Sequence, residues 1–126
     1  MAKILFCEDE EKLQKLIRVM LRSSTHEVFI ASDGIEGLEL IERERPDIIF
    51  ADISMPHCDG LQMADAIKAR PHLADIPLVF VTAFAQRAEV EEGYRHGAVG
   101  YLIKPFSPAE LRAKIEIFLA KANSGR

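Results

Sequence analysis

The sequence predicts a doubly wound α/β fold, in which helices cover both faces of a parallel sheet. Three observations support this class. Short apolar runs alternate with amphipathic stretches along the chain, without internal repeats. Three of these runs are apolar at successive positions, as in strands buried on both faces. Repeated alternation of strand and helix leads to right-handed crossovers and parallel pairing.

Five apolar runs are the predicted strands of this sheet. Each run is too short for a helix, and most of its residues are β-branched or aromatic. The runs cover residues 4–7, 28–31, 48–51, 78–81 and 101–103. Because all five would run in the same direction, their carboxyl ends are expected at one edge of the sheet.

Two helices are predicted between the first three strands. After residues 4–7, apolar side chains recur at helical spacing and form one stripe: Leu13, Leu16, Ile17, Met20 and Leu21. A second helix is predicted over about 33–43, with Ser32 or Asp33 as its N-cap. Gly37 lies inside this helix, where glycine costs roughly 1 kcal/mol relative to alanine.

Three further helices are predicted in the second half of the chain. The third covers about 61–69 and the fourth about 87–95, each followed shortly by a proline or a glycine. The fifth has the clearest start. Ser107 can cap it, Pro108 takes the first helical position, and Glu110 completes a capping box.

Length and composition are those of one globular domain. We expect it to cover residues 1–126, with a core over about 3–122 and a tail at 123–126. The net charge of −4, without a long basic run, argues against direct nucleic-acid binding. Cys7 and Cys58 match no zinc spacing, and neither a signal peptide nor a long apolar span is present. The expectation is a cytoplasmic protein without membrane contact.

Chemically distinctive side chains follow four of the predicted strands. In chain order they are Glu8, Asp9, Asp52, Thr82 and Lys104. Ligands of doubly wound folds bind beyond the carboxyl ends of the strands, so these side chains are expected to converge. Each residue alone has a plainer explanation as a turn, cap, strand or surface residue. Their joint occurrence at successive strand ends favours a functional site.

The chemistry of these residues suits phosphoryl transfer. Crowded carboxylates need a cation, and Mg²⁺ prefers oxygen ligands. Asp9 and Asp52 are the candidate direct ligands, and Glu8 would act through water. Asp52 can also be the nucleophile that becomes an aspartyl phosphate. Thr82 offers a hydroxyl donor and Lys104 a positive charge for the phosphoryl oxygens.

Four segments carry a resemblance to a known family. In the order CEDEE, DIIFADISMPHCDG, VFVTAFA and GYLIKPF, they resemble the CheY-like receiver domain of response regulators in two-component signalling systems. The resemblance covers residues 4 to about 122. It implies a flavodoxin-like (βα)5 three-layer sandwich with the parallel strand order 2-1-3-4-5.

The resemblance assigns roles to the strand-end residues. Asp52 would accept a phosphoryl group from a phosphohistidine of a histidine kinase or histidine phosphotransfer protein. The Mg²⁺ ligands it implies are Glu8, Asp9, Asp52 and the backbone carbonyl of Ser54. Glu8 replaces the more frequent aspartate, a variant that should keep the metal site. The Lys104–Pro105 peptide bond is commonly cis in this family.

The resemblance also implies a switch. Thr82 would shift toward the phosphate and Tyr101 would move inward, changing the surface formed by the fourth helix, fifth strand and fifth helix. A downstream protein target would bind there, and the domain would be a monomer or a phosphorylation-linked homodimer. No enzyme is implied beyond Mg²⁺-dependent self-phosphorylation and autodephosphorylation. Ser54 and Phe84 flank the site and are expected to affect the lifetime of the phosphoryl group.

Several alternatives stay open at this point. The chain is expected to be a single-domain regulator, or else a receiver from a larger regulator or hybrid kinase. A pseudo-receiver would keep the fold without phosphorylation. A flavin carrier is disfavoured by the acidic segment after the first strand, and an aspartyl-phosphate hydrolase by Ser54, where a second aspartate is usual. His57 and Cys58 are expected to lie in a solvated loop.

Overall fold

The computed structural model describes residues 2–83 and 86–124 and contains one five-stranded parallel sheet. The strands are β1 (Lys3–Cys7), β2 (Glu27–Ala31), β3 (Ile48–Asp52), β4 (Leu78–Thr82) and β5 (Gly100–Ile103). The helices are α1 (Glu11–Met20), α2 (Gly34–Glu44), α3 (Gly60–Lys68), α4 (Arg87–Arg95) and α5 (Pro108–Ser124). Strand order is β2-β1-β3-β4-β5, which confirms the expected doubly wound fold.

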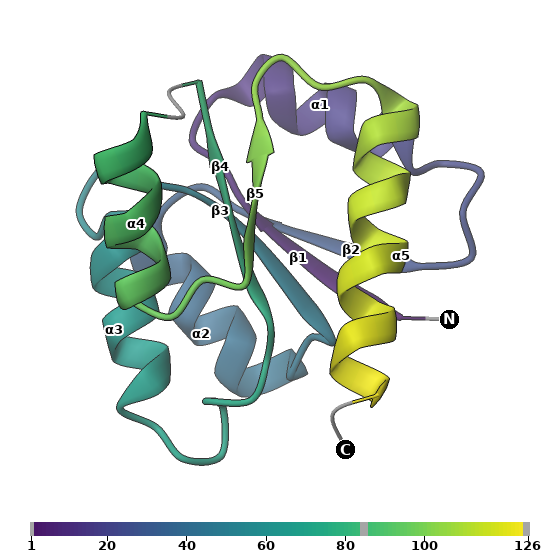
Figure 1. Cartoon of the computed structure of the whole chain (residues 1–126). Coiled ribbons are helices and arrows are strands. Elements are labelled where there is room, and N and C mark those ends of the chain that lie inside the picture. Colours follow the sequence, from purple (N-terminus) through teal and green to yellow (C-terminus); the bar gives the residue numbers. More distant parts are fainter. Residues whose placement is uncertain (1, 84–85, 125–126) are drawn as a thin grey trace.

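The helices form two layers around the sheet, with α1 and α5 on one side and α2, α3 and α4 on the other (Figure 1). Neighbouring side chains of the central strands alternate between these layers. In β1, Phe6 packs toward α1 and α5, whereas Leu5 and Cys7 pack toward α2 and α3. Strands β3 and β4 are buried along their whole length. Apolar runs without alternation therefore reflect burial on both faces.

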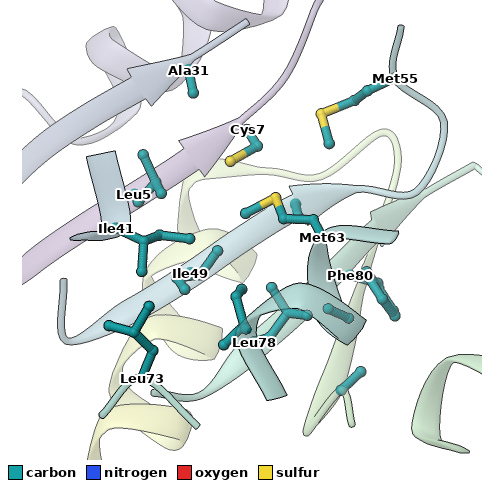
Figure 2. Close-up of a cluster of buried hydrophobic side chains, with 14 of the residues drawn as sticks. Leu5, Cys7, Ala31, Ile41, Ile49, Met55, Met63, Leu73, Leu78 and Phe80 are labelled. Carbon is teal, nitrogen blue, oxygen red and sulfur yellow. The ribbon is translucent and has the colours of Figure 1, made fainter. Parts of the chain in front are cut away.

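The two layers of the core differ in content. On the α1 and α5 side, Phe6 and Phe50 stack with their ring centroids 4.7 Å apart. On the other side, sulfur-containing side chains fill the space beside aliphatic ones, among them Cys7 and Met63 (Figure 2). Close packing explains the glycine at position 37 of α2, because a Cβ at this position would lie 2.7 Å from Cys7 Sγ.

Side-chain caps begin three of the helices. Asp33 accepts a hydrogen bond from the backbone N–H of Glu36 and is the N-cap of α2. The predicted capping box of α5 is present, since the N–H of Glu110 donates to Ser107 Oγ at 3.0 Å and the N–H of Ser107 donates to Glu110 Oε1 at 3.2 Å. A second capping box, at Asp59, begins α3 and was not predicted.

The predicted apolar stripe of α1 is only partly buried. Ile17 and Met20 lie in the core, and Leu13 is half-buried. Leu16 is 48% exposed, so burial does not extend over the whole apolar stripe. Helical spacing therefore identifies the apolar face of α1, but it does not show how much of that face is buried.

Candidate functional site

The candidate site lies beyond the carboxyl ends of β1, β3, β4 and β5. Glu8 and Asp9 follow β1, Asp52 is the last residue of β3, and Lys104 follows β5. The parallel register aligns Asp52 with Val81, one residue before the end of β4. The strand-end positions predicted from the sequence are therefore brought to one edge of the sheet.

Three carboxylates form the acidic part of the site. One oxygen from each of Glu8, Asp9 and Asp52 lies within 4.8 Å of the others. Glu8 is 2% exposed and Asp52 is 8% exposed, whereas Asp9 faces solvent. Clustered carboxylate oxygens are the donors that Mg²⁺ prefers, and a site with one open side leaves room for water ligands. The donor set fits the expected ion.

Lys104 places a positive charge against this cluster. Its Nζ lies 2.9 Å from Glu8 Oε1 and 2.5 Å from Asp52 Oδ2. Burial raises the pKa of the Glu8 carboxyl above its ordinary value, although hydrogen bonds from Glu10 N–H and Lys104 oppose this. Burial acts against the charge of Lys104, but contacts with the two carboxylates outweigh it and raise the lysine pKa. One ammonium contacts two of the three carboxylates, which leaves excess negative charge for a divalent ion.

Both oxygens of Asp52 have donors. Oδ1 accepts a hydrogen bond from the backbone N–H of Ser54 at 3.0 Å, and Oδ2 accepts one from Lys104. The family resemblance implied that the Ser54 carbonyl binds Mg²⁺ and that Ser54 affects the lifetime of the phosphoryl group, and both roles stay predictions. The hydrogen bond from the Ser54 N–H to Asp52 is a local turn interaction. An aspartate side chain commonly accepts a hydrogen bond from the backbone N–H two residues later, so this contact could be expected from the sequence.

Two further residues lie against the backbone of the site. Gly60 ends one of the segments that carry the family resemblance, whereas Gln14 was not predicted to lie near the site. Gln14 of α1 donates through Nε2 to the backbone carbonyl of Glu8 at 2.6 Å and to Ser32 Oγ at 3.2 Å. Gly60 begins α3 against the end of β3, where a Cβ would lie 2.7 Å from the backbone oxygen of Asp52. An Asp-Gly pair at a helix start is a visible signal, but nothing in the sequence places Gln14 against Glu8.

Thr82 and its neighbours join β4 to the site. Thr82 is 8% exposed, and its backbone carbonyl accepts a hydrogen bond from the N–H of Lys104 at 2.8 Å. The Lys104–Pro105 peptide bond is cis, as expected. Phe84, which was expected to flank the site, lies outside the described residues.

Tyr101 lies inside the protein, against α4. It is 9% exposed, and its ring packs at 5.9 Å from the ring of Phe80 and edge-on at 5.4 Å from that of Tyr94. Its hydroxyl donates to the backbone carbonyls of Glu89 and Val90. The structure thus holds the candidate switch residue in an inward position.

The loop after β3 departs from one expectation. His57 is exposed, as expected, and has a left-handed backbone with φ of 67°. Cys58 is half-buried and packs against the core, so its assignment to a solvated loop was wrong. The carbonyl of Cys58 accepts a hydrogen bond from the N–H of Gly34, which draws the loop onto the start of α2.

An open, largely apolar pocket of about 370 Å³ lies beside the site, between α1 and the segment after β5. Its lining residues are Glu10, Lys12, Leu13, Leu16, Ala83, Lys104, Pro105 and Phe106.

Among the described residues, no helix has both the length and the apolar character that crossing a membrane would require.

Curated relatives support a single family. The family model described as the response regulator receiver domain matches residues 4–116. The chain is 38% identical over 120 residues to the transcriptional regulatory protein PdtaR of Mycobacterium tuberculosis, covering 94% of this chain and 57% of that protein. It is 33% identical over 120 residues to the alkaline phosphatase synthesis transcriptional regulatory protein PhoP of Bacillus subtilis, covering 95% and 49%. The chain spans about half the length of the curated relatives it matches.

Solved structures agree with this assignment. The chemotaxis protein CheY4 of Vibrio cholerae superposes with a TM-score of 0.87 at 29% identity, covering 92% of this chain and 97% of that chain. The receiver domain of a sensor histidine kinase from Pseudomonas aeruginosa superposes with a TM-score of 0.86 at 33% identity, covering 94% and 98%, and holds a magnesium ion in its active site cleft. The chain therefore belongs to the response regulator receiver domain family, the phosphorylation-dependent signalling domains of two-component systems.

Proposed function

We propose that this domain is a signalling switch in which Asp52 accepts a phosphoryl group from a phosphohistidine of a histidine kinase or histidine phosphotransfer protein. One observation carries the proposal. The Asp52 carboxylate is held between the Ser54 N–H and Lys104 Nζ, beside Glu8 and Asp9, at the open edge of the sheet. A positioned nucleophile with fixed charges around it is what phosphoryl transfer requires.

In the transfer step, a carboxylate oxygen of Asp52 attacks the phosphorus atom of the donor. The bond between phosphorus and the histidine nitrogen breaks, and its electron pair leaves with the imidazole. The product is an acyl phosphate on Asp52. Lys104 already contacts this carboxylate, and it would follow the new negative charge onto the phosphoryl oxygens. Thr82, at the end of the next strand, would donate its hydroxyl to the same group.

Glu8, Asp9, Asp52 and the Ser54 carbonyl would hold Mg²⁺, which supplies positive charge next to the phosphoryl oxygens when it is bound. The neighbouring kinase receiver with magnesium in its cleft supports this assignment. Glu8 contributes through its buried carboxylate, whose Oε2 also accepts a hydrogen bond from the N–H of Glu10 at 2.9 Å. This bond holds the carboxylate toward the site.

The output surface would be formed by α4, β5 and α5. Each of these elements exposes an apolar residue, namely Tyr94, Ile103 and Ile117, at 48%, 39% and 47% exposure. Phosphorylation would shift the population of Thr82 and Tyr101 conformations and thereby change binding of a downstream protein target. The domain would act in the cytoplasm, as a monomer or a phosphorylation-linked homodimer.

The chain would act either as a single-domain regulator or as the receiver of a larger protein. The second possibility is favoured by one observation, that its curated relatives are about twice its length. A pseudo-receiver that keeps the fold without phosphorylation is the main alternative class, and the presence of Asp52 with Lys104 in contact argues against it.

The test is covalent modification by a small phosphodonor. Wild-type protein with acetyl phosphate and Mg²⁺ should gain one phosphoryl group, which mass spectrometry assigns to Asp52 and which hydroxylamine removes. Asp52→Asn should gain none, and Asp75→Asn, a change at an exposed aspartate away from the site, should behave as wild type. A stable, hydroxylamine-resistant adduct elsewhere would contradict the proposal. Affinity capture with and without beryllofluoride would then identify state-dependent partners.

A further inference from the structure

Gly93, in the last turn of α4, faces the side chain of Tyr101. A Cβ built at Gly93 would overlap the Tyr101 hydroxyl, and it would lie 2.8 Å from Cζ of the ring. It would also lie 3.0 Å from Cδ2 of Phe80. Tyr101 therefore occupies space that any other residue at position 93 would fill.

The absence of a side chain at Gly93 also opens the helix backbone to Tyr101. The Tyr101 hydroxyl donates to the carbonyl oxygens of Glu89, at 3.2 Å, and Val90, at 3.0 Å. These carbonyls precede Gly93 by four and three residues, on the turn that a Cβ at position 93 would lean over. A carbonyl oxygen has two lone pairs, so it can accept the hydroxyl as well as a helical N–H.

The backbone conformation of α4 does not require glycine at this position. Gly93 does not have a positive φ, and the left-handed residue after α4 is Gly97, with φ of 104°. Alanine inside a helix favours folding over glycine by about fivefold in the equilibrium constant. Close approach of Tyr101 is the structural reason for a residue that otherwise weakens the helix.

We propose that Gly93 is a positioning residue that makes room for the inward conformation of Tyr101 and so sets the population of that conformation. Its effect on signalling rests on the proposed function, in which the position of Tyr101 responds to phosphorylation of Asp52. Its effect on the ring itself does not depend on phosphorylation.

The first experiment follows the ring directly in the full chain. The protein contains only two tyrosines, so labelling with 3-fluorotyrosine produces two ¹⁹F resonances, which Tyr94→Phe assigns. In wild type, Tyr101 should be protected from a soluble gadolinium chelate and Tyr94 should be broadened. In Gly93→Ala, both resonances should be broadened. A Tyr101 resonance that keeps its shift and its protection in Gly93→Ala would overturn the proposal.

The second experiment is a double-mutant cycle on the folding equilibrium, measured by urea unfolding. Tyr101→Leu removes the atoms that a Cβ at position 93 would overlap. In this background, Gly93→Ala should raise the folding equilibrium constant by up to about fivefold, as helix propensity predicts. The remaining close contact, with Phe80 Cδ2 at 3.0 Å, sets this as an upper value. In the wild-type background this gain should be absent or reversed. An equal gain in both backgrounds would overturn the proposal, and the cycle remains informative if Gly93→Ala alone folds poorly.

The third experiment separates this inference from the proposed function. Phosphorylation of Asp52 by acetyl phosphate and binding of beryllofluoride are measured in wild type and in Gly93→Ala. If the inward ring position and occupation of the phosphoryl site favour each other, a variant that disfavours the inward ring should bind beryllofluoride more weakly. The expected loss in Gly93→Ala is at least about fivefold. If Asp52 is modified in wild type and beryllofluoride binds both proteins equally, the role of Gly93 in the switch is refuted. If Asp52 is never modified, the proposed function fails, while the ring experiment still decides whether Gly93 positions Tyr101.

Discussion

Replacing Lys104 with methionine tests the electrostatic balance of the site, because it removes the ammonium and keeps a similar side-chain length. Its Nζ lies 2.9 Å from Glu8 Oε1 and also contacts Asp52, and Glu8 is 2% exposed. Removing one partner of a fully buried ion pair costs about 3–5 kcal/mol. The Lys104 side chain is 22% exposed, so water screens part of this interaction. We expect a loss of about 2–3 kcal/mol in the free energy of unfolding without divalent ions.

The assay is thermal unfolding followed by circular dichroism, first in EDTA and then with Mg²⁺. For a domain of this size, 1 kcal/mol corresponds to about 3–4 °C, so the variant should melt about 6–12 °C below wild type in EDTA. Mg²⁺ should raise the Tm of both proteins. The increase should be larger for Lys104→Met, because the carboxylates of this variant retain more uncompensated negative charge.

Lys15→Met is the matched control. Lys15 pairs with Glu11 on the surface of α1, and both side chains are largely exposed. Exposed pairs contribute about 0–1 kcal/mol, so this variant should melt close to wild type in both solutions. If Lys104→Met melts like the control in EDTA, or if Mg²⁺ raises the Tm of both proteins equally, Lys104 does not balance the buried carboxylates as inferred.

Three further predictions concern the site and its scaffold. Burial raises the folded-state pKa of Glu8 above 4.5, so its contribution to stability is complete below this value and is lost as pH rises through the raised pKa. In EDTA, Glu8→Gln should therefore lose less stability than wild type between pH 4.5 and neutral pH in urea titrations. Asp59→Ala, which removes the N-cap of α3, should cost about 1 kcal/mol, and an unchanged urea midpoint would contradict this. Phe50→Ala, at a fully buried ring stacked on Phe6, should cost about 3–5 kcal/mol in the same titration, and a loss under about 1 kcal/mol would show that the core refills the cavity.

The positions of β1, β3 and β4 could be predicted from the sequence, because burial on both faces requires apolar residues in succession. Once the strands are known to be parallel, their carboxyl ends must share an edge, and this brings Glu8, Asp52 and Lys104 near one another without any further information. The N-cap at Asp33 and the capping box of α5 are likewise local, since their hydrogen bonds join residues three positions apart. The strand order came from the family resemblance, because periodicity contains no information on which strands are neighbours.

Other features depend on residues far apart in the chain. Leu16 continues the helical pattern of α1, yet its side chain is 48% exposed. Gln14 contacts the backbone of Glu8 and the side chain of Ser32 only because α1 folds back over the end of β1. In the sequence, both residues look like ordinary positions on a surface helix.

Gly93 shows most clearly what the sequence alone cannot reveal. In the sequence it is a glycine that weakens a predicted helix, and Tyr101 is an aromatic residue of the following strand. Their relation exists only because α4 packs against β5, so that the Tyr101 hydroxyl reaches the helix backbone at the point where a Cβ is missing. The sequence by itself determined the strands, the caps of α2 and α5 and the set of charged residues at the sheet edge, because these follow from short-range patterns. Only the tertiary structure decided which side chains meet, because close packing between distant segments depends on where whole elements lie.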